Sequence, residues 1–405
     1  MIKIAVMGHG VVGSGTVEVF YKNRENICKK CGTDVDIKYI LDLRDFPSLP
    51  YSDKFTKSFD DIINDDEVKV VVEVMGGLNP AYDYVKRCLS SGKSVVTSNK
   101  ELVAAHGAKL LKIAKENNIN FLFEASVGGG IPIIRPLSQC LAANSIDEIC
   151  GILNGTTNFI LNKMINEGMS FEDALKLAQQ LGYAERNPSA DVDGFDTCRK
   201  ICILASLAFG YHVYPDGIYT EGITNIKLED VVYAKKLGYA VKLIGYSKRI
   251  SDDKIFCATY PALIPFSNSL STVDDVFNAI MVKGDATGDV MFYGKGAGKL
   301  PTASAVVADI IDACTHINRR KNIFWEDAKA DYVIPCDEHE TAMYVRAQCD
   351  ISDFTRLFGS TKALHADNGD VLFITPVMKE KEINKILSQS GIEIKAKIRV
   401  MEQAV

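Results

Sequence analysis

The sequence has no long hydrophobic run and no excess of positive charge. None of its apolar stretches reaches the ~20 residues that a membrane-spanning helix needs. The N-terminal residues show neither the basic region nor the apolar core of a secretory signal. The formal net charge is −6, which argues against nucleic acid or an anionic membrane as the main partner. We therefore expect a cytoplasmic protein with no membrane and no nucleic-acid partner.

The cysteines do not form the pattern of a disulfide framework. There are 11, an odd number, and several sit inside apolar periods, as Cys198, Cys202 and Cys314 do. Thiols of this kind pack as small hydrophobic groups in a reducing compartment. Cys28 and Cys31 form a CxxC, but this spacing without a second ligand pair is a weak zinc signal. Two thiols at a helix end are the simpler interpretation.

Strand and helix patterns alternate over the first 130 residues. Helical stretches separate five apolar runs that are rich in β-branched residues, at 2–8, 35–41, 68–77, 94–99 and 119–126. Such runs suit strands that are buried on both faces. Repeated strand–helix units predict the α/β class, with a Rossmann-type, doubly wound parallel sheet in a domain over residues 1–130.

The pattern changes after residue 130. Residues 131–320 mix helices with strands, one of them expected at 267–273, which predicts a second, α+β domain with a largely antiparallel sheet. The apolar helix over 302–320 is expected to pack back on the first domain. Residues 321–340 have the composition of a linker.

A third domain is expected over residues 340–405. Its order is a strand, a helix over 354–364, a hairpin around Asn368 and Gly369, a second helix and a last strand. Asn-Gly between two apolar runs is a strong hairpin signal. The order predicts a small βαββαβ unit.

A glycine-rich turn follows the first predicted strand. The sequence GHGVVGSG places Gly8, Gly10 and Gly13 in GxGxxG spacing, immediately before a helix that includes Val11 and Val12. The first glycine makes the tight turn, the second lets the backbone approach a pyrophosphate, and the third allows close helix–strand packing. The helix N-terminus then attracts the phosphates. These five residues are predicted to bind a dinucleotide.

The ends of the next strands add candidate cofactor residues. Asp42 ends the second strand, where a carboxylate hydrogen bonds to a ribose 2′-hydroxyl and favours NAD, whereas Arg44 could accept a 2′-phosphate. Asp42 could also be a solvated strand-end residue, so the choice between NAD and NADP stays open. Gly76, Ser98 and Lys100 lie at the same predicted edge of the sheet. Lys100 starts a helix, where a cation opposes the helix dipole. This placement is a modest pointer to a function, and from position alone a surface lysine is the favoured interpretation.

An acidic stretch, residues 182–200, leads into an apolar helix. Asp193 has the position of an N-cap, and Asp196 and Lys200 are spaced i, i+4 and can pair on one helix face. From spacing alone a structural cap and surface pair is the favoured interpretation.

Four motifs change that balance. In chain order they are ASVGGGIP, GILNGTTNFIL, GYAE followed by DVDGFDTCRKICILASLAF, and GKGAGKLPTASAVVADI. Together they resemble homoserine dehydrogenase. Because the given sequence holds no amino-acid kinase segment, we expect the monofunctional form. The resemblance implies reversible, NAD(P)-dependent interconversion of L-homoserine and L-aspartate 4-semialdehyde, in the synthesis of threonine, methionine and isoleucine.

The resemblance also implies roles for individual residues. The family's proton donor falls on Lys200, and its lysine near the nicotinamide falls on Lys100. Asp196 and Glu185 take the places of substrate-binding acids. The other implied positions are Gly155 and Thr156 for the substrate, Gly298 for the cofactor, and Glu124, Val127, Gly129 and Ile131 for a sodium ion.

The chain departs from the family pattern in two places. Leu41 stands where many members carry an arginine, which favours NAD. The tail is similar to an ACT regulatory domain, in which threonine acts as the effector, but CDISDFTRLFG replaces the expected proline–glycine turn, so threonine binding stays open. The family also implies that residues 131–320 form the homoserine-binding catalytic and dimerisation domain, and that the protein is a homodimer or higher homo-oligomer. A dinucleotide-sensing regulator and an S-adenosylmethionine methyltransferase are the competing readings, and neither explains all four motifs.

Overall fold

The computed structural model describes residues 1–359, 362–366 and 368–401. Its first unit holds a six-stranded parallel sheet in the order β3-β2-β1-β4-β5-β6. The strands are β1 (Ile2–Met7), β2 (Val35–Leu41), β3 (Phe55–Thr56), β4 (Val68–Glu73), β5 (Ser94–Thr97) and β6 (Phe121–Leu122). The helices between them are α1 (Val11–Lys22), α2 (Arg24–Cys31), α3 (Asp60–Ile63), α4 (Ala81–Ser90) and α5 (Lys100–Glu116). The predicted Rossmann-type, doubly wound fold is confirmed.

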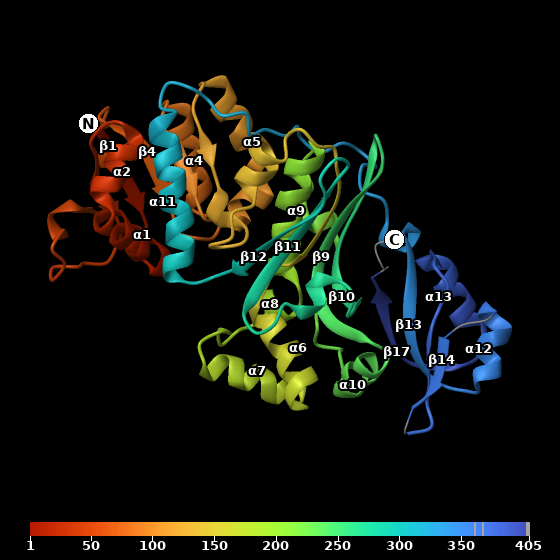
Figure 1. Ribbon diagram of the computed structural model, residues 1–405. Helices are drawn as coiled ribbons and strands as arrows, with labels where there is room; N and C mark the ends of the chain where they lie inside the picture. Colours follow the sequence, from red (N-terminus) through yellow and green to blue (C-terminus); the bar gives the residue numbers. More distant parts are fainter. Residues whose placement is uncertain (360–361, 367, 402–405) are drawn as a thin grey trace.

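A second, mostly antiparallel sheet begins with β7 (Ile146–Ile152) and runs in the order β12-β11-β7-β9-β10 through the middle of the molecule (Figure 1). Its other strands here are β9 (Tyr239–Ser251), β10 (Lys254–Pro265), β11 (Phe277–Gly284) and β12 (Gly288–Lys295), and β8 (Tyr219–Thr220) pairs with β10. Its helices are α6 (Gly155–Glu167), α7 (Phe171–Gln180), α8 (Ser189–Val192), α9 (Phe195–Phe209) and α10 (Leu228–Lys236). The α+β composition agrees with the prediction.

One predicted strand of this unit is wrong. Within residues 267–273 the chain forms a short 3-10 helix, Ser269–Thr272. The side chain of Asn268 accepts a hydrogen bond from the backbone N–H of Leu270 and caps that turn. Asn and Ser side chains that bond to nearby backbone groups favour such capped turns over a strand.

The C-terminal unit comprises β13 (Glu340–Gln348), α12 (Ile351–Phe358), β14 (Lys362–His365), β15 (Val371–Ile374), β16 (Met378–Lys379), α13 (Glu380–Gln389) and β17 (Glu393–Val400). The hairpin between β14 and β15 forms as predicted. The helix expected over 354–364 is wrong in extent, because it ends at Phe358. Gly359 follows with a φ of 79°, a conformation that suits glycine and ends helices.

The C-terminal unit is joined to the middle unit through the sheet itself. Strand β17 pairs with β10, and β13, β15 and β14 continue the same sheet. The expected linker is also packed: Trp325 is only 1% exposed and donates from Nε1 to Nδ1 of His212 at 2.8 Å. The 321–340 segment is therefore anchored to the rest of the protein at Trp325.

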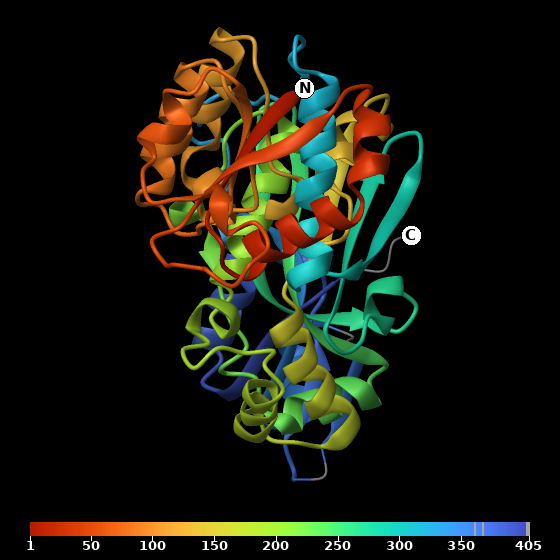
Figure 2. The ribbon, with the colours of Figure 1, turned by 90° about the vertical axis from the view of Figure 1, so that its left-hand side faces the viewer.

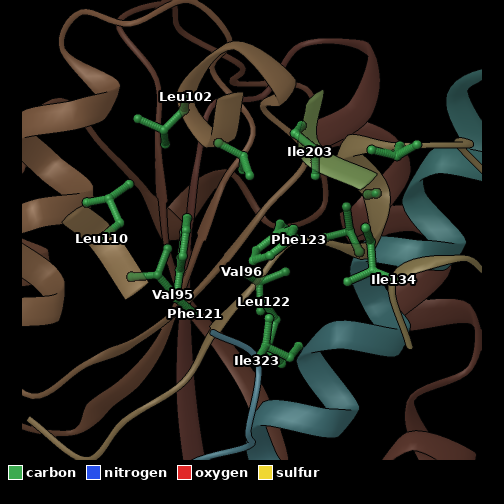
Figure 3. Packing of buried hydrophobic residues seen from close by; sticks show 14 of the residues in the cluster. Val95, Val96, Leu102, Leu110, Phe121, Leu122, Phe123, Ile134, Ile203 and Ile323 are labelled. Carbon is green, nitrogen blue, oxygen red and sulfur yellow. The ribbon is translucent and has the colours of Figure 1, made fainter. Parts of the chain in front are cut away.

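Helix α11 (Lys299–Thr315) leaves the middle unit and packs on the first one, against α1 (Figures 1 and 2). A Cβ on Gly15 would lie 3.2 Å from the Ala303 side chain, so the helices meet closely. One of the hydrophobic clusters spans both units. In Figure 3, Val96, Leu122 and Phe123 of the first unit belong to the same buried cluster as Ile203 of α9 and Ile134. The units that carry the predicted cofactor and substrate residues thus share one core.

None of the helices that the structure describes is both long and apolar enough to cross a membrane. All 11 cysteines lie among the described residues as free thiols. Cys28 accepts a hydrogen bond from the backbone N–H of Val35. Over the described ranges no group of three or more His, Cys, Asp or Glu side chains could hold a metal ion.

Candidate active site

The glycine turn has the geometry that dinucleotide binding requires. Gly8 has a φ of 101°, which favours glycine. A Cβ on Gly13 would lie 2.0 Å from the carbonyl oxygen of Gly8, so only glycine allows this approach of α1 to the turn. Nothing lies within 4 Å of a Cβ on Gly10, and this open position adjoins Val11 and Val12 in the first turn of α1. A pyrophosphate can therefore approach the free N–H groups there.

Asp42 lies directly after β2, beside this turn. Its carboxylate accepts a hydrogen bond from the backbone N–H of His9 at 2.8 Å and is gripped by two nitrogens of the Arg44 guanidinium, at 2.9 Å each. The Arg44 guanidinium holds the pKa of Asp42 far below its usual range. The Arg44 side chain is 62% exposed. Sequence reasoning named both residues but not their pairing with each other.

The loop after β4 is built by a residue that the sequence analysis missed. Glu73 is fully buried, and its carboxylate accepts hydrogen bonds from the N–H groups of Met75 and Gly76 and from the Thr97 hydroxyl. The Asn99 side chain donates to the carbonyl oxygen of Gly77 at 2.6 Å. These bonds fix Gly76 at the carboxyl ends of the strands, where ligands bind in such sheets. Glu73 is the last residue of β4, just as Asp42 directly follows β2, and this position in the sequence could have identified it.

Ser98 and Lys100 follow β5 at the same edge. The backbone N–H of Ser98 donates to the carbonyl oxygen of Glu73. Helix α5 begins at Lys100, as predicted, and Asn99 caps it by accepting from the N–H of Leu102. The Lys100 side chain is 38% exposed and reaches away from its own helix to form an ion pair with Asp196 of α9. A cation at this unfavourable helix position is thus held by a partner from another unit.

Helix α9 carries the centre of the site. It is buried between α5 of the first unit and strands β7, β9 and β10 of the second (Figure 1). Asp196 is 3% exposed and Lys200 8% exposed. Lys200 Nζ lies 2.7 Å from Asp196 Oδ2 and donates to the carbonyl oxygen of Leu153 at 2.7 Å. The i, i+4 pair is therefore a buried ion pair, not the surface pair that spacing alone suggested.

The side chains of Asn154 and Asp191 complete this cluster. Asn154 Nδ2 donates to Asp191 at 2.7 Å and to Asp196 at 2.9 Å. Its Oδ1 accepts from the backbone N–H of Thr157 and caps α6. The sequence analysis assigned no role to Asp191 or to Asn154. The asparagine in the GILNGTTN motif was the signal that could have found it.

The charges of the cluster perturb one another. Burial lowers the pKa of Lys200, and so does the Lys100 ammonium, while Asp196 acts in the opposite direction. Burial alone would raise the pKa of Asp196, but the two ammonium groups hold it below its usual range. Burial would lower the pKa of Lys100, yet Asp196 raises it overall. Lys200 is thus the lysine of the two that gives up its proton more readily.

The acidic stretch before α9 differs from its sequence interpretation. Asp193 does not cap α9: it follows α8, and the capping position is Gly194, with a φ of 86°. A Cβ there would lie within 3.3 Å of Thr220 and of the carbonyl oxygen of Glu221, so the close approach of these segments requires glycine. Local propensity favoured an Asp cap, but tertiary packing placed the glycine there.

The predicted substrate residues lie on two neighbouring segments. Gly155 and Thr156 form the first turn of α6. The Thr156 hydroxyl donates to the carbonyl oxygen of Tyr183, which ties α6 to the loop that carries Glu185. Glu185 itself is exposed, and among the contacts of the described residues none joins its carboxylate to Asp196. The structure brings Gly155 and Thr156 to the cluster through Asn154, but not Glu185.

The implied sodium residues occupy the turn after β6. The Glu124 carboxylate accepts hydrogen bonds from three consecutive N–H groups, of Ile133, Ile134 and Arg135. Its oxygens are therefore committed. Within the described ranges, no backbone hydrogen bond outside regular elements ends on the main-chain oxygens of Val127, Gly129 and Ile131. A set of unpaired carbonyl oxygens is suited to a hard cation.

The GKGAG motif, residues 294–298, packs against this turn. A Cβ on Gly129 would lie 2.4 Å from the carbonyl oxygen of Gly296. Gly298, with a φ of 122°, precedes α11, the helix that packs on α1. The motif containing Gly298 therefore connects the predicted sodium turn with the dinucleotide-binding unit.

The arrangement can transfer a proton next to a dinucleotide. A lysine with a lowered pKa, paired with a carboxylate, can act as acid or base toward a hydroxyl or carbonyl group. Lys200 and Lys100 both pair with Asp196, and Lys100 lies at the edge of the first sheet that also carries the glycine turn. This is the requirement of a dehydrogenase, in which the cofactor takes the hydride and the protein manages one proton.

Comparison with known proteins agrees with this chemistry. A family model described as "Homoserine dehydrogenase, NAD binding domain" matches residues 8–124, and one described as "Homoserine dehydrogenase" matches residues 132–311. The homoserine dehydrogenase of Pseudomonas aeruginosa is 40% identical over 355 residues, which cover 86% of this chain and 82% of that protein. The crystal structure of a homoserine dehydrogenase from Thiobacillus denitrificans matches with a TM-score of 0.92 and 36% identity, over 99% of this chain and 98% of that chain. A hyperthermophilic archaeal homoserine dehydrogenase in complex with NADPH matches with a TM-score of 0.65 and 29% identity, over 77% of this chain and 97% of that chain. The chain therefore belongs to the homoserine dehydrogenase family.

Proposed function

We propose that the chain performs the reaction of its family at the buried cluster of Lys100, Asp196 and Lys200. The observation that carries the proposal is the ion pair from Lys100, at the cofactor edge of the first sheet, to Asp196 in the middle unit. Through Asp196, Lys100 at the predicted cofactor edge is linked to Lys200 of α9. Within the described residues, these are the only two lysines that share one buried carboxylate. The reaction is L-homoserine + NAD(P)⁺ ⇌ L-aspartate 4-semialdehyde + NAD(P)H + H⁺.

Each residue of the cluster then has one task. Bound NAD(P)⁺ supplies the hydride acceptor. Lys200, as the neutral amine, takes the proton of the homoserine hydroxyl, and as the ammonium it returns that proton to the aldehyde oxygen in the reverse direction. Asp196 positions Lys200 and offsets its charge. Lys100, from the cofactor edge, stabilises negative charge on the reacting oxygen.

The remaining substrate groups are assigned to the neighbouring segments. The carboxylate of homoserine lies at the N-terminus of α6, where the N–H groups of Gly155 and Thr156 have no intrahelical acceptor. The ammonium group is held by Glu185, whose exposed carboxylate is free to approach a ligand. We further propose that the enzyme acts in the cytoplasm, in the synthesis of threonine, methionine and isoleucine.

The direct test measures formation of NADH or NADPH by the purified protein with L-homoserine, and cofactor oxidation with L-aspartate 4-semialdehyde. Turnover in both directions is expected, and L-serine, which is one methylene shorter, should react far more slowly. A protein that binds NAD(P)H but turns over neither substrate would be a dinucleotide sensor, and the proposal would be wrong.

The cofactor choice is assigned to Asp42 and Arg44. Asp42 can accept a ribose 2′-hydroxyl, while the Arg44 charge is already neutralised by that carboxylate, so we favour NAD. Arg44→Ala should lower kcat/KM for NADP relative to NAD by about tenfold, because it removes the nearby cation and leaves the carboxylate facing a 2′-phosphate. Steady-state kinetics with both cofactors measure this ratio. An unchanged ratio would remove Arg44 from the site.

A sodium ion is proposed at the turn after β6, bound by main-chain oxygens of Glu124, Val127, Gly129 and Ile131. The unpaired carbonyl oxygens of the last three support it. The ion would stiffen the turn that contacts Gly296. Unfolding temperatures in NaCl and in choline chloride of equal ionic strength test this assignment, and equal values would refute it.

The C-terminal unit is proposed to be an ACT-like regulatory domain in a homodimer or higher homo-oligomer. Its order supports the first part, because it is βαββαβ with one additional two-residue strand, β16, before α13. Arg399 of β17 supports a route to the active site, because it pairs with Glu221, beside Gly194 and the start of α9. Threonine is the candidate effector. A thermal-shift titration with threonine and light scattering of the free protein test the two assignments separately.

A further inference from the structure

A buried carboxamide beside the substrate segment has no partner. Asn278, in β11, is 1% exposed, and neither Nδ2 nor Oδ1 finds a hydrogen-bond partner within the part of the chain that the structure describes. Most buried side-chain amides are bonded, since burial of an unpaired one carries a large penalty. The amide of Asn120, equally buried, makes three bonds to main-chain groups. Asn278 is thus an exception that needs an explanation.

The surroundings of Asn278 are the glycines of the family motifs. A Cβ on Gly296 would lie 2.0 Å from Nδ2, so this glycine packs flat against the amide. A Cβ on Gly155 would lie 3.5 Å from Oδ1. Asn278 therefore separates the GKGAG motif from the first turn of α6. Larger residues at either glycine would collide with the amide or with the chain next to it.

The carboxamide and the helix terminus offer complementary groups. The first N–H groups of α6, a helix of 13 residues, have no intrahelical acceptor. The amide can present its Nδ2–H to the same place, because a half turn about its last side-chain bond exchanges nitrogen and oxygen and breaks no hydrogen bond. The Nδ2–H group, once turned toward Gly155, and the first N–H groups of α6 are neutral donors beside the positive end of a helix dipole, and such donors suit a carboxylate.

We propose that Asn278 donates from Nδ2 to the carboxylate of the amino-acid substrate, alongside the N–H groups of Gly155 and Thr156. The inference rests on the proposed function and adds to it a residue that selects amino acids over simple amino alcohols. In the free enzyme the amide bears the cost of being unpaired, and the substrate removes that cost on binding. Asn278 is a binding and specificity residue, and it takes no part in the proton transfer.

The test replaces Asn278 by leucine, which has a similar shape and no polar atoms. KM for L-homoserine should rise by about 10- to 100-fold, as expected for loss of a hydrogen bond to a charged group. KM for the cofactor should not change. The inhibition constant of 3-aminopropan-1-ol, which is homoserine without its carboxylate, should stay within about twofold of the wild-type value. Asn278→Ala provides a second variant if leucine does not fit against Gly296.

Asn120→Leu is the matched control. It should lower the unfolding temperature, because three bonds are lost, and should leave KM for homoserine unchanged. Asn278→Leu should do the reverse: the free protein keeps or gains stability, and the rise in unfolding temperature on adding homoserine shrinks. The proposal is overturned if homoserine and the amino alcohol are affected equally, or if KM is unchanged while stability falls. Wild-type protein without homoserine turnover would instead refute the proposed function.

Discussion

Lys200→Ala is expected to lower kcat by about 10²- to 10⁴-fold in both directions, the range observed for loss of a general acid–base group. Lys200 is the buried amine whose pKa the surroundings lower, and it sits 2.7 Å from the carboxylate that positions it. The other lysine of the cluster, Lys100, cannot replace it as readily, because Asp196 raises the pKa of Lys100. The measurement is kcat as a function of pH, with homoserine and with the semialdehyde.

The matched control for this variant is Lys93→Met. Lys93 is also buried, burial also lowers its pKa, and its ammonium donates to the carbonyl oxygens of Asp65 and Val68. It precedes β5, at the opposite end of the sheet from the glycine turn. This variant should lose stability but keep the pH profile of kcat. If Lys200→Ala retains near-normal turnover with the wild-type pH dependence, Lys200 is not the proton donor.

Sequence reasoning was strongest where one local rule determined the structure. The β-branched runs predicted the parallel strands, because such runs have no exposed face to interrupt them. The GxGxxG spacing predicted a turn in which a side chain at Gly13 would collide with Gly8. The start of α5 at Lys100 was also predictable, since Asn99 is a favourable cap.

It failed where tertiary contacts overrode local preference. Asp193 has the better capping chemistry, yet Gly194 takes the position because Thr220 and Glu221 pack against it from another part of the chain. The same limit applies to Asp196 and Lys200. Their spacing is that of a surface pair, and only the burial of α9 between two units makes it the centre of a site. The joining of β17 to β10 had no local signal at all.

Asp196→Asn and Lys100→Met are expected to move the pH profile in opposite directions. Oxidation of homoserine needs neutral Lys200, so its rate rises with pH through the pKa of that lysine. Asp196 raises this pKa and Lys100 lowers it. Removing the carboxylate should therefore shift the rising limb to lower pH, and removing the neighbouring ammonium should shift it to higher pH. Profiles of kcat against pH for oxidation measure both shifts, and shifts of the same sign would contradict the assignment.

Asp196→Asn should also have the larger effect on stability. It leaves two ammonium groups without their shared carboxylate, and breaking a buried ion pair costs about 3–5 kcal/mol. The cost falls when Lys200 loses its proton. A lysine whose pKa is lower in the folded state binds fewer protons there than in the unfolded chain, so the free energy of unfolding rises with pH between the folded and unfolded pKa values. In Asp196→Asn this window should begin at a lower pH than in the wild type. Urea unfolding as a function of pH measures it, and a free energy that fell with pH in that range would show that Lys200 remains charged without Asp196.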